Sequence, residues 1–420
     1  MSKVVWIINH YASPPSVPGG SRHFQLARYL CHHGWRAIII ASSVDHPSGT
    51  QRLDLGEDYR LENHDGVLVL RINTPAYSGN GSGRAKNMLA FAVQLLRKKV
   101  LGALDRPSLI IGSSVHPFAV LSAWWLSKRF GVPFVFEVRD LWPQSLIDIG
   151  KLAENSLLAR ALRLLESFLY KRADRIITLL PFAGDYIAQH GGSHDKVRWI
   201  SNGVDLASFP EDYSESSLTH PRPWTLMYFG SHGEANGLDV LLDAVAILKP
   251  KVSHANLSVK LRLIGDGPVK SKLKEQAIRL GLTADDVVFE QAVPKAQIPE
   301  LAKQADAFVI TVLDLPDLYR YGISMNKLFD YMAAAKPIVI ASAARNNPVA
   351  DANAGIIVPP ADPIALAEGI FALATAPIEE RVRMGAAARA HVKAEYDYPI
   401  LAERLAAELD AVLASAESEK

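Results

Sequence analysis

The chain has 420 residues, which is too long for one compact core and indicates two domains. Its 45 lysines and arginines balance 44 aspartates and glutamates, so no overall field draws it to nucleic acid and any recognition of phosphate has to be local. A single cysteine, Cys31, excludes an internal disulfide framework and is expected to be a packed helix residue in a protein of a reducing compartment.

Short apolar segments alternate with longer amphipathic helices along almost the whole chain. This alternation is typical of parallel sheets with crossover helices, and it predicts an α/β fold of two Rossmann-like domains that face each other across a cleft. The strands predicted for the first half are Val4–Ile8, Ala37–Ala41, Val67–Ile72, Leu109–Gly112, Phe134–Val138, Arg175–Thr178 and Val197–Ile200. The strands predicted for the second half are Thr225–Phe229, Ser258–Ile264, Val287–Glu290, Ala307–Thr311, Pro337–Ala341 and Gly355–Val358.

A polar, proline-bearing segment without periodicity separates the two halves. We therefore predict an N-terminal domain over residues 1–209, a linker over residues 210–223 and a C-terminal domain over residues 224–395. The most apolar longer region, Leu109–Leu126, is interrupted by glycine, serine, histidine and proline, so it predicts a strand, a loop and a helix rather than a membrane span. A soluble protein is expected.

Three features of the first half are candidates for binding. Gly19 and Gly20 stand just before a helix N-terminus, where backbone N–H groups favour an anion, although a bare turn would look the same. His116 follows a predicted strand and is a candidate catalytic residue in contact with substrate, or else a structural histidine. The basic amphipathic segment Arg84–Val100 would either rest on an anionic bilayer or pack against the first sheet. No group of residues has metal-ligand spacing, so no metal is expected.

The second half carries the most informative segment. Asn326 and Lys327 are expected in the first turn of a helix, where unpaired N–H groups, the helix dipole and the lysine charge favour phosphate. Asp330 follows within about one turn, so its carboxylate could hold sugar hydroxyls at the same mouth. The alternative is that Asn326 only caps the helix and Lys327 is a solvated surface residue. Glycine-rich turns at Gly230-Ser231 and Leu263–Pro268 could bring further N–H groups to a diphosphate.

Taken in chain order, these motifs resemble family-4 retaining glycosyltransferases of the GT-B fold. The resemblance spans nearly the whole chain. It rests on the early Gly-Gly pair, Ala173–Ile177, Ile200–Asp205, Leu263–Pro268, Asn326–Asp330 and Ala354–Pro360. The segment Glu137–Pro143 is similar to a subgroup of bacterial surface-polysaccharide transferases, including those that move N-acetylated amino sugars such as N-acetyl-L-fucosamine.

The resemblance implies transfer of a sugar from a UDP-sugar to a saccharide or lipid-linked acceptor, with retained anomeric configuration and without metal or other cofactor. It implies work in the cytoplasm, with peripheral contact at the inner face of the cell membrane, and a final helix, residues 396–420, that crosses back to the N-terminal domain. It assigns diphosphate contacts to the Gly20 backbone and ribose contacts to Asp330. Arg139 would steady the leaving phosphate and Asp140 would orient or deprotonate the acceptor, unless the two form only a surface pair or a helix cap.

Two departures from the family pattern bear on function. Ser231 and Asn236 stand in a turn where relatives often carry arginine and lysine, so Lys327 must carry more of the diphosphate charge. Gly322 replaces the first of two glutamates spaced eight residues apart. One alternative is a GT-B sugar-nucleotide epimerase, which would need several carboxylates and histidines gathered in the cleft, where this sequence offers few. The other is a catalytically silent nucleotide-binding subunit of polysaccharide assembly, which the missing glutamate at Gly322 suggests.

Overall fold

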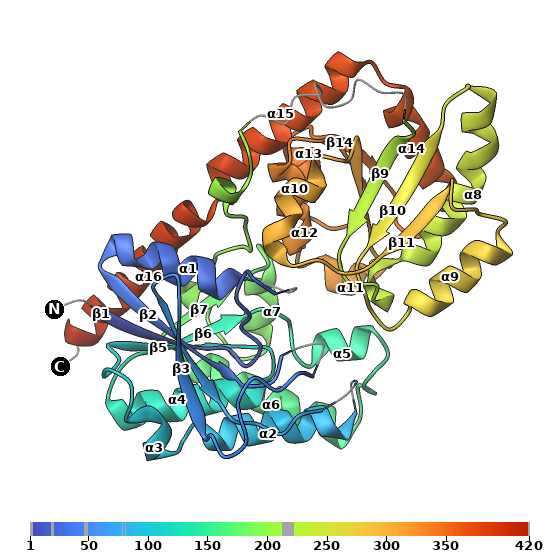
Figure 1. The fold of residues 1–420 in the computed structure, drawn as a ribbon. Coiled ribbons are helices and arrows are strands. Elements are labelled where there is room, and N and C mark those ends of the chain that lie inside the picture. The colour runs from blue at the N-terminus through green and yellow to red at the C-terminus, as the bar shows by residue number, and fades with distance from the viewer. Residues whose placement is uncertain are drawn as a thin grey trace. The chain divides into compact units, whose positions relative to one another are not determined.

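The computed structural model describes residues 3–17, 21–45, 49–77, 79, 81–211 and 222–418, apart from the side chain of Leu318 (Figure 1). The chain forms two compact α/β units. Unit 1 runs through Ser201 and resumes at Tyr398, while residues 202–397 make up most of unit 2. Residues 202–209, assigned to the N-terminal domain from the sequence, thus belong to unit 2. Most of the predicted linker lies outside the described residues.

Unit 1 is built on an eight-stranded sheet with the order β3-β4-β2-β1-β5-β6-β7-β8. Its strands are β1 (Lys3–Ile8), β2 (Trp35–Ser42), β3 (Tyr59–His64), β4 (Val67–Ile72), β5 (Leu109–Ser113), β6 (Phe134–Val138), β7 (Arg175–Thr178) and β8 (Val197–Trp199). Apart from the pair β3 and β4, neighbouring strands of this sheet pair in parallel, as the apolar segments predict.

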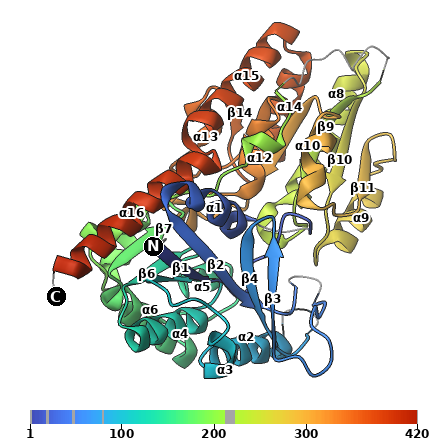
Figure 2. The ribbon, with the colours of Figure 1, turned by 60° about the vertical axis from the view of Figure 1, so that its left-hand side comes forward.

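One strand of this sheet, β3, was not predicted. It pairs antiparallel with β4 at the edge of the sheet, with Leu61 opposite Leu70 (Figure 2). Its sequence, Tyr59-Arg-Leu-Glu-Asn-His64, is mostly polar because an antiparallel edge strand can leave one face in water. A search for apolar runs therefore passes over it.

Unit 2 contains a six-stranded sheet with the order β11-β10-β9-β12-β13-β14, and these strands are all parallel. They are β9 (Trp224–Phe229), β10 (Val259–Ile264), β11 (Val287–Glu290), β12 (Ala307–Thr311), β13 (Ile338–Ala341) and β14 (Gly355–Val358). Each lies within one residue of its predicted bounds. Apolar side chains from both faces of the sheet form two buried clusters with the surrounding helices.

The helices of unit 1 are α1 (Arg22–Leu30), α2 (Ser82–Gln94), α3 (Lys98–Leu101), α4 (Pro117–Phe130), α5 (Gln144–Asp148), α6 (Leu157–Arg172), α7 (Ala183–Gln189) and α16 (Tyr398–Ser418). Those of unit 2 are α8 (Leu238–His254), α9 (Lys270–Arg279), α10 (Ile298–Ala302), α11 (Pro316–Tyr319), α12 (Asn326–Ala333), α13 (Pro348–Asp351), α14 (Pro363–Thr375) and α15 (Ile378–Glu395). Within the described ranges, no helix combines the length and apolar character that a membrane crossing requires.

Two local predictions need correction. The segment Arg84–Val100 is two helices, α2 and α3, because the chain leaves the helical conformation at Arg97, whose ψ is 129°. Cys31 is exposed at the end of α1 instead of packed, and its Sγ atom lies 2.9 Å from the carbonyl oxygen of Arg28.

The last helix, α16, is part of unit 1. Its Leu401, Leu405 and Leu409 are buried in the same apolar cluster as Leu26 of α1. At its far end Asp410 accepts a hydrogen bond from the indole Nε1 of Trp35 at 2.9 Å. The core of unit 1 is therefore completed by both ends of the chain.

Candidate functional site

The strand order of each sheet marks where a ligand is expected. In unit 1 the order reverses between β1 and β5, and in unit 2 it reverses between β9 and β12. Ligands of open α/β sheets bind at such switch points, beyond the carboxyl ends of the strands. The loops that follow these strands are therefore the first places to look for function in each unit.

In unit 2 the side chain of Lys327 reaches from α12 into the loop after β9. Its ammonium lies 3.0 Å from the hydroxyl of Tyr228, contacts the Oδ1 atom of Asn236 and stands 4.6 Å from the centre of the Tyr228 ring. The Tyr228 hydroxyl and the Asn236 amide both donate to the carbonyl oxygen of Ser231, at 2.7 and 2.9 Å. Three residues that the sequence predicted for the donor site, Gly230, Ser231 and Lys327, thus lie close together in unit 2, and their role stays a prediction.

The partners of Lys327 are neutral, and within the described residues it forms no ion pair. Burial lowers the pKa of Lys327 to about 7, because no carboxylate compensates for the loss of water. Burial also raises the pKa of Tyr228, so its hydroxyl stays protonated. The arrangement is a cation that lacks a counter-ion, which is what a site for an anionic ligand requires.

The glycine turns after β9 and β10 touch each other. A Cβ atom on Gly265 would lie 1.9 Å from the carbonyl oxygen of Gly230, and one on Gly267 would lie 2.4 Å from that of His232, so only glycine fits at these two positions. The His232 side chain is fully buried, and neither ring nitrogen has a hydrogen-bond partner among the described residues. Burial, with Lys270 nearby, lowers the pKa of His232 to about 4, so the imidazole is neutral.

Asp330 lies one turn beyond Lys327 and is buried. Both of its carboxylate oxygens contact the ammonium of Lys295, which follows β11. Burial raises the pKa of Asp330 and Lys295 opposes that shift. Sequence reasoning missed Lys295, although its place after a strand of the same sheet was a usable signal.

The start of α12 does not agree with the alternative in which Asn326 only caps the helix. Met325, not Asn326, is the N-cap, and Asn326 is the first helical residue. Gly322 has φ 105°, a left-handed conformation in which a glutamate would be strained. The missing acid thus coincides with a backbone that favours glycine.

Unit 1 places a buried charge network beneath its switch point. The Glu137 carboxylate accepts hydrogen bonds from Arg22 Nε at 2.9 Å, from His23 Nε2 at 2.6 Å and from Ser113 Oγ at 2.6 Å. Burial alone would raise the pKa of Glu137, but His23 and Arg22 hold that pKa well below its ordinary value. The network fixes the start of α1 to β6, the strand that leads into Arg139 and Asp140.

Asp140 is exposed and no hydrogen bond fixes its carboxylate among the described residues. The backbone N–H of Arg139 donates to Ser114 Oγ at 3.0 Å, while the Arg139 Nε atom is buried and has no partner within the described ranges. Asp140 lines a small hollow whose other walls are mainly apolar. The remaining lining residues are Ser114, Pro117, Phe136, Trp142, Glu166, Leu169 and Tyr170.

The surroundings of His116 favour the structural alternative over a catalytic or substrate contact. It is fully buried at the start of α4, where its Nδ1 atom accepts from the Ala119 N–H at 3.3 Å. Its Nε2 atom therefore carries the proton and donates to His10 Nδ1 at 2.8 Å, and His10 Nε2 donates to Asn87 Oδ1 at 2.6 Å. Burial lowers the pKa of His116 to about 3, so this chain of neutral groups holds loops together.

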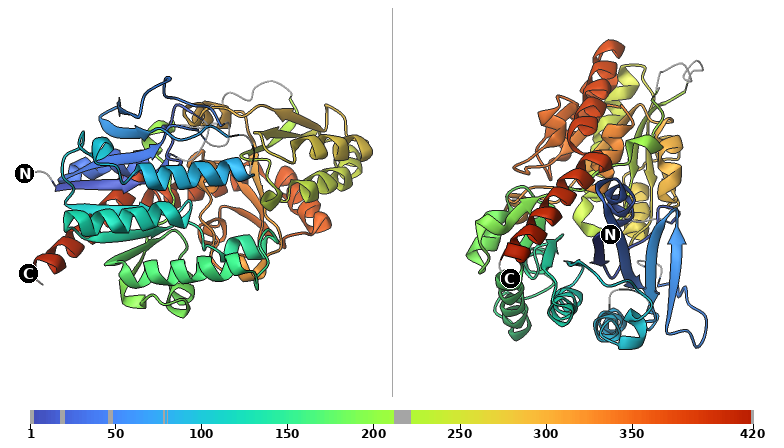
Figure 3. Two further views of the ribbon diagram at one scale, coloured as in Figure 1. Left: turned by 90° about the horizontal axis from the view of Figure 1, so that it is seen from below. Right: turned by 90° about the vertical axis from the view of Figure 1, so that its left-hand side faces the viewer.

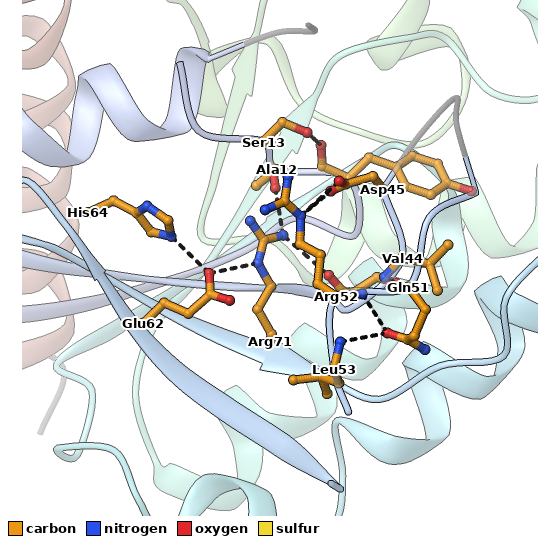
Figure 4. A network of polar contacts seen from close by, with 12 residues as sticks. Ala12, Ser13, Val44, Asp45, Gln51, Arg52, Leu53, Glu62, His64 and Arg71 are labelled. Carbon is orange, nitrogen blue, oxygen red and sulfur yellow. Dashed lines mark hydrogen bonds and ion pairs between the residues drawn. The ribbon is translucent and has the colours of Figure 1, made fainter. Parts of the chain in front are cut away.

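A further network holds the loop after β1 (Figure 4). Buried Arg71 of β4 donates to the carbonyl oxygens of Ala12 and Ser42, at 3.0 and 3.2 Å, and pairs with Glu62 at 3.3 Å.

Two further predicted positions, Gly19 and Gly20, lie outside the described residues. Within the described ranges, no three His, Cys, Asp or Glu side chains come together as a metal site would require.

Comparison with known proteins decides the family. Residues 19–203 match the Glycosyl transferase 4-like domain, and residues 223–376 match the Glycosyl transferases group 1 family. This chain is a glycosyltransferase. The two-domain layout agrees with HepE of Anabaena, solved in complex with UDP and glucose, at a TM-score of 0.68 and 18% identity over 97% of this chain and 100% of that one. This likeness shows the fold, two α/β units with parallel, Rossmann-like sheets.

Two curated relatives are similar in sequence. The probable glycosyltransferase WbjE of Pseudomonas aeruginosa is 24% identical over 307 residues, which are 71% of this chain and 73% of WbjE. The GDP-mannose-dependent monoacylated alpha-(1-6)-phosphatidylinositol monomannoside mannosyltransferase of Corynebacterium glutamicum is 26% identical over 227 residues, 51% of this chain and 56% of that protein.

Proposed function

We propose that this glycosyltransferase moves a sugar from a UDP-sugar to a saccharide or lipid-linked acceptor and retains the anomeric configuration. The proposed donor carries an N-acetylated amino sugar and the proposed product is a cell-envelope polysaccharide. The resemblance to surface-polysaccharide transferases supports this reading, as do the match to WbjE and the UDP held by HepE.

The observation that carries the proposal is the environment of Lys327. Its ammonium contacts Asn236, a residue of the turn in which the resembled family often has arginine or lysine. A cation supplied by α12 thus reaches the place that a cation from the turn after β9 would occupy. A diphosphate bound there would give Lys327 its missing counter-ion.

The roles follow from chemistry. Lys327 and the N–H groups of the glycine turns would bind the diphosphate and stabilise the charge that develops on it as the sugar leaves. Asp330 would accept hydrogen bonds from the ribose hydroxyls once it exchanges Lys295 for them. Asp140, exposed and without a fixed partner, would orient the acceptor hydroxyl, and the leaving phosphate oxygen would assist its deprotonation.

The test is UDP binding by isothermal titration calorimetry. Lys327→Ala removes a hydrogen bond to a charged group and is expected to weaken binding by about 2–3 kcal/mol. The matched control is Lys251→Ala, which removes a surface lysine paired with Glu368 and should leave affinity unchanged. Equal affinity in both folded variants would contradict the proposal.

A silent nucleotide-binding subunit is a second candidate, favoured by the absence of an acid at Gly322. A screen of UDP-sugars by mass spectrometry, with a lipid-diphosphate sugar as acceptor, separates the two. Transfer or donor hydrolysis with any sugar supports the enzyme, whereas UDP binding without turnover of any donor supports the silent subunit.

A further inference from the structure

Three helices of unit 1 form one continuous layer over the sheet. In the left view of Figure 3, α2, α4 and α6 lie side by side. The Ser122 hydroxyl of α4 donates to the Ala92 carbonyl oxygen of α2 at 2.9 Å, and the rings of Trp124 on α4 and Phe168 on α6 meet edge to face at 4.8 Å. The three outer faces therefore make a single surface, which we call the helical face.

The helical face is unusually apolar for a surface turned to water. Six of the fifteen large apolar side chains that are exposed in the described residues lie on these three helices. They are Leu89, Val93, Trp125, Leu157, Leu158 and Leu164. Leu157 is 83% exposed and Leu164 is 74% exposed, so α6 turns an apolar stripe outward instead of inward.

The same face is basic. The three helices contain eight lysines and arginines but a single acidic residue, Glu166, which is buried. Six of the eight cations are exposed: Lys86, Lys128, Arg129, Arg160, Lys171 and Arg172. The whole chain, by contrast, has almost equal numbers of basic and acidic residues.

Exposed leucines and a tryptophan among cations, without an exposed carboxylate on the same helices, match the chemistry of an anionic membrane surface. Apolar side chains enter the boundary between headgroups and acyl chains, while lysine and arginine bind lipid phosphates. A nucleic acid would use the cations but not the leucines. We propose that the helical face docks on an anionic lipid bilayer.

This inference deepens the proposed function, on which it rests for the presence of a lipid-linked acceptor. It also extends the contact expected from Arg84–Val100, because α2 belongs both to that segment and to the helical face. In that segment Lys99 is engaged with Asp58 at 2.8 Å, whereas α4 and α6 supply most of the exposed apolar groups.

The experiment is co-sedimentation of the full chain with vesicles of phosphatidylcholine and phosphatidylglycerol in equal parts, and with pure phosphatidylcholine. The wild-type protein is expected to bind the anionic vesicles, and more weakly as salt rises. Joint substitution Leu157→Ser, Leu158→Ser and Leu164→Ser should reduce partition about tenfold or more. Joint substitution Lys128→Gln, Arg129→Gln and Arg160→Gln should reduce it at low salt by about fivefold for each charge removed.

A control replaces three exposed apolar residues of unit 2. Ile278→Ser, Ile378→Ser and Val382→Ser should leave vesicle binding unchanged. UDP affinity is measured for every variant, so that loss of vesicle binding with intact UDP binding tests the helical face and loss of UDP binding tests the proposed function. Failure of the wild-type protein to bind, equal binding by the leucine variant and the control, or a self-association that the leucine substitutions abolish would overturn the inference.

Discussion

The buried charges near the carboxyl edges of the two sheets differ in whether they have a counter-ion. In unit 1, the carboxylate of Glu137 is surrounded by Arg22 and His23, so its charge is already balanced. In unit 2, Lys327 has neutral partners and its pKa falls to about 7. The same layered architecture thus provides a preformed scaffold in one unit and an incomplete charge pair in the other. The incomplete pair is the one that a ligand can complete.

The largest effect is expected when the carboxylate that balances Arg22 is removed. Glu137→Gln removes the counter-charge of buried Arg22, and it should lower the free energy of unfolding of unit 1 by about 3–5 kcal/mol. The control is Glu290→Gln, which removes the partner of Arg262 in a partly exposed ion pair of unit 2 and should cost at most about 1 kcal/mol. Urea denaturation of both variants makes the measurement, and similar losses would contradict the contrast.

A smaller effect concerns Asp140, the residue of unit 1 that is proposed to act on the acceptor. If Asp140 positions or deprotonates the acceptor, Asp140→Asn should lower kcat by about 100-fold while the donor KM changes little. Steady-state kinetics with a turned-over UDP-sugar decide the point. A rise in the donor KM with an unchanged kcat would instead indicate that Asp140 contributes to donor binding.

The absence of a counter-ion for Lys327 among the described residues predicts that UDP binding depends on pH. Only the charged form of Lys327 attracts the diphosphate, and the free protein loses that form as pH rises through about 7. The Kd of UDP should therefore rise toward tenfold per pH unit between about pH 7.5 and 9, where the terminal phosphate is already ionised. Lys327→Arg keeps its charge, so its profile should be flat over this range. Parallel profiles in titration calorimetry would show that Lys327 does not titrate there.

The smallest effect is expected at Asp330. A residue that holds the ribose equally in ground state and transition state affects binding alone, so Asp330→Asn should raise the donor KM about tenfold and leave kcat nearly unchanged. A collapse of kcat with an unchanged KM would instead make Asp330 part of the chemistry.

The parts of the fold that were predictable are those with local signals. The parallel strands are apolar runs, and α12 opens with Asn326-Lys327 after a polar loop, so both could be read from neighbouring residues. The edge strand β3 lacks such a run. The sequence also gives no sign that a residue is buried with a distant partner, which is why His116 remained ambiguous.

The missed contacts of the candidate site join residues far apart in the chain. Lys295 and Asp330 are 35 positions apart, and Arg22 and Glu137 are 115 positions apart. Charged residues of this kind look like ordinary surface residues in a sequence. Only the topology of each sheet brings them to one edge.

Because α16 is part of the core of unit 1, unit 1 cannot finish folding until α16 has been synthesised. During synthesis, the strands and helices of unit 1 up to β8 emerge first, followed by all of unit 2 and then α16. Until Leu401, Leu405 and Leu409 arrive, the apolar side of α1 that they cover stays open to water. Residues 202–397, which make up most of unit 2, are one continuous stretch and can finish folding before α16 is available to unit 1. Chaperones that bind the nascent chain would therefore be expected to bind at α1.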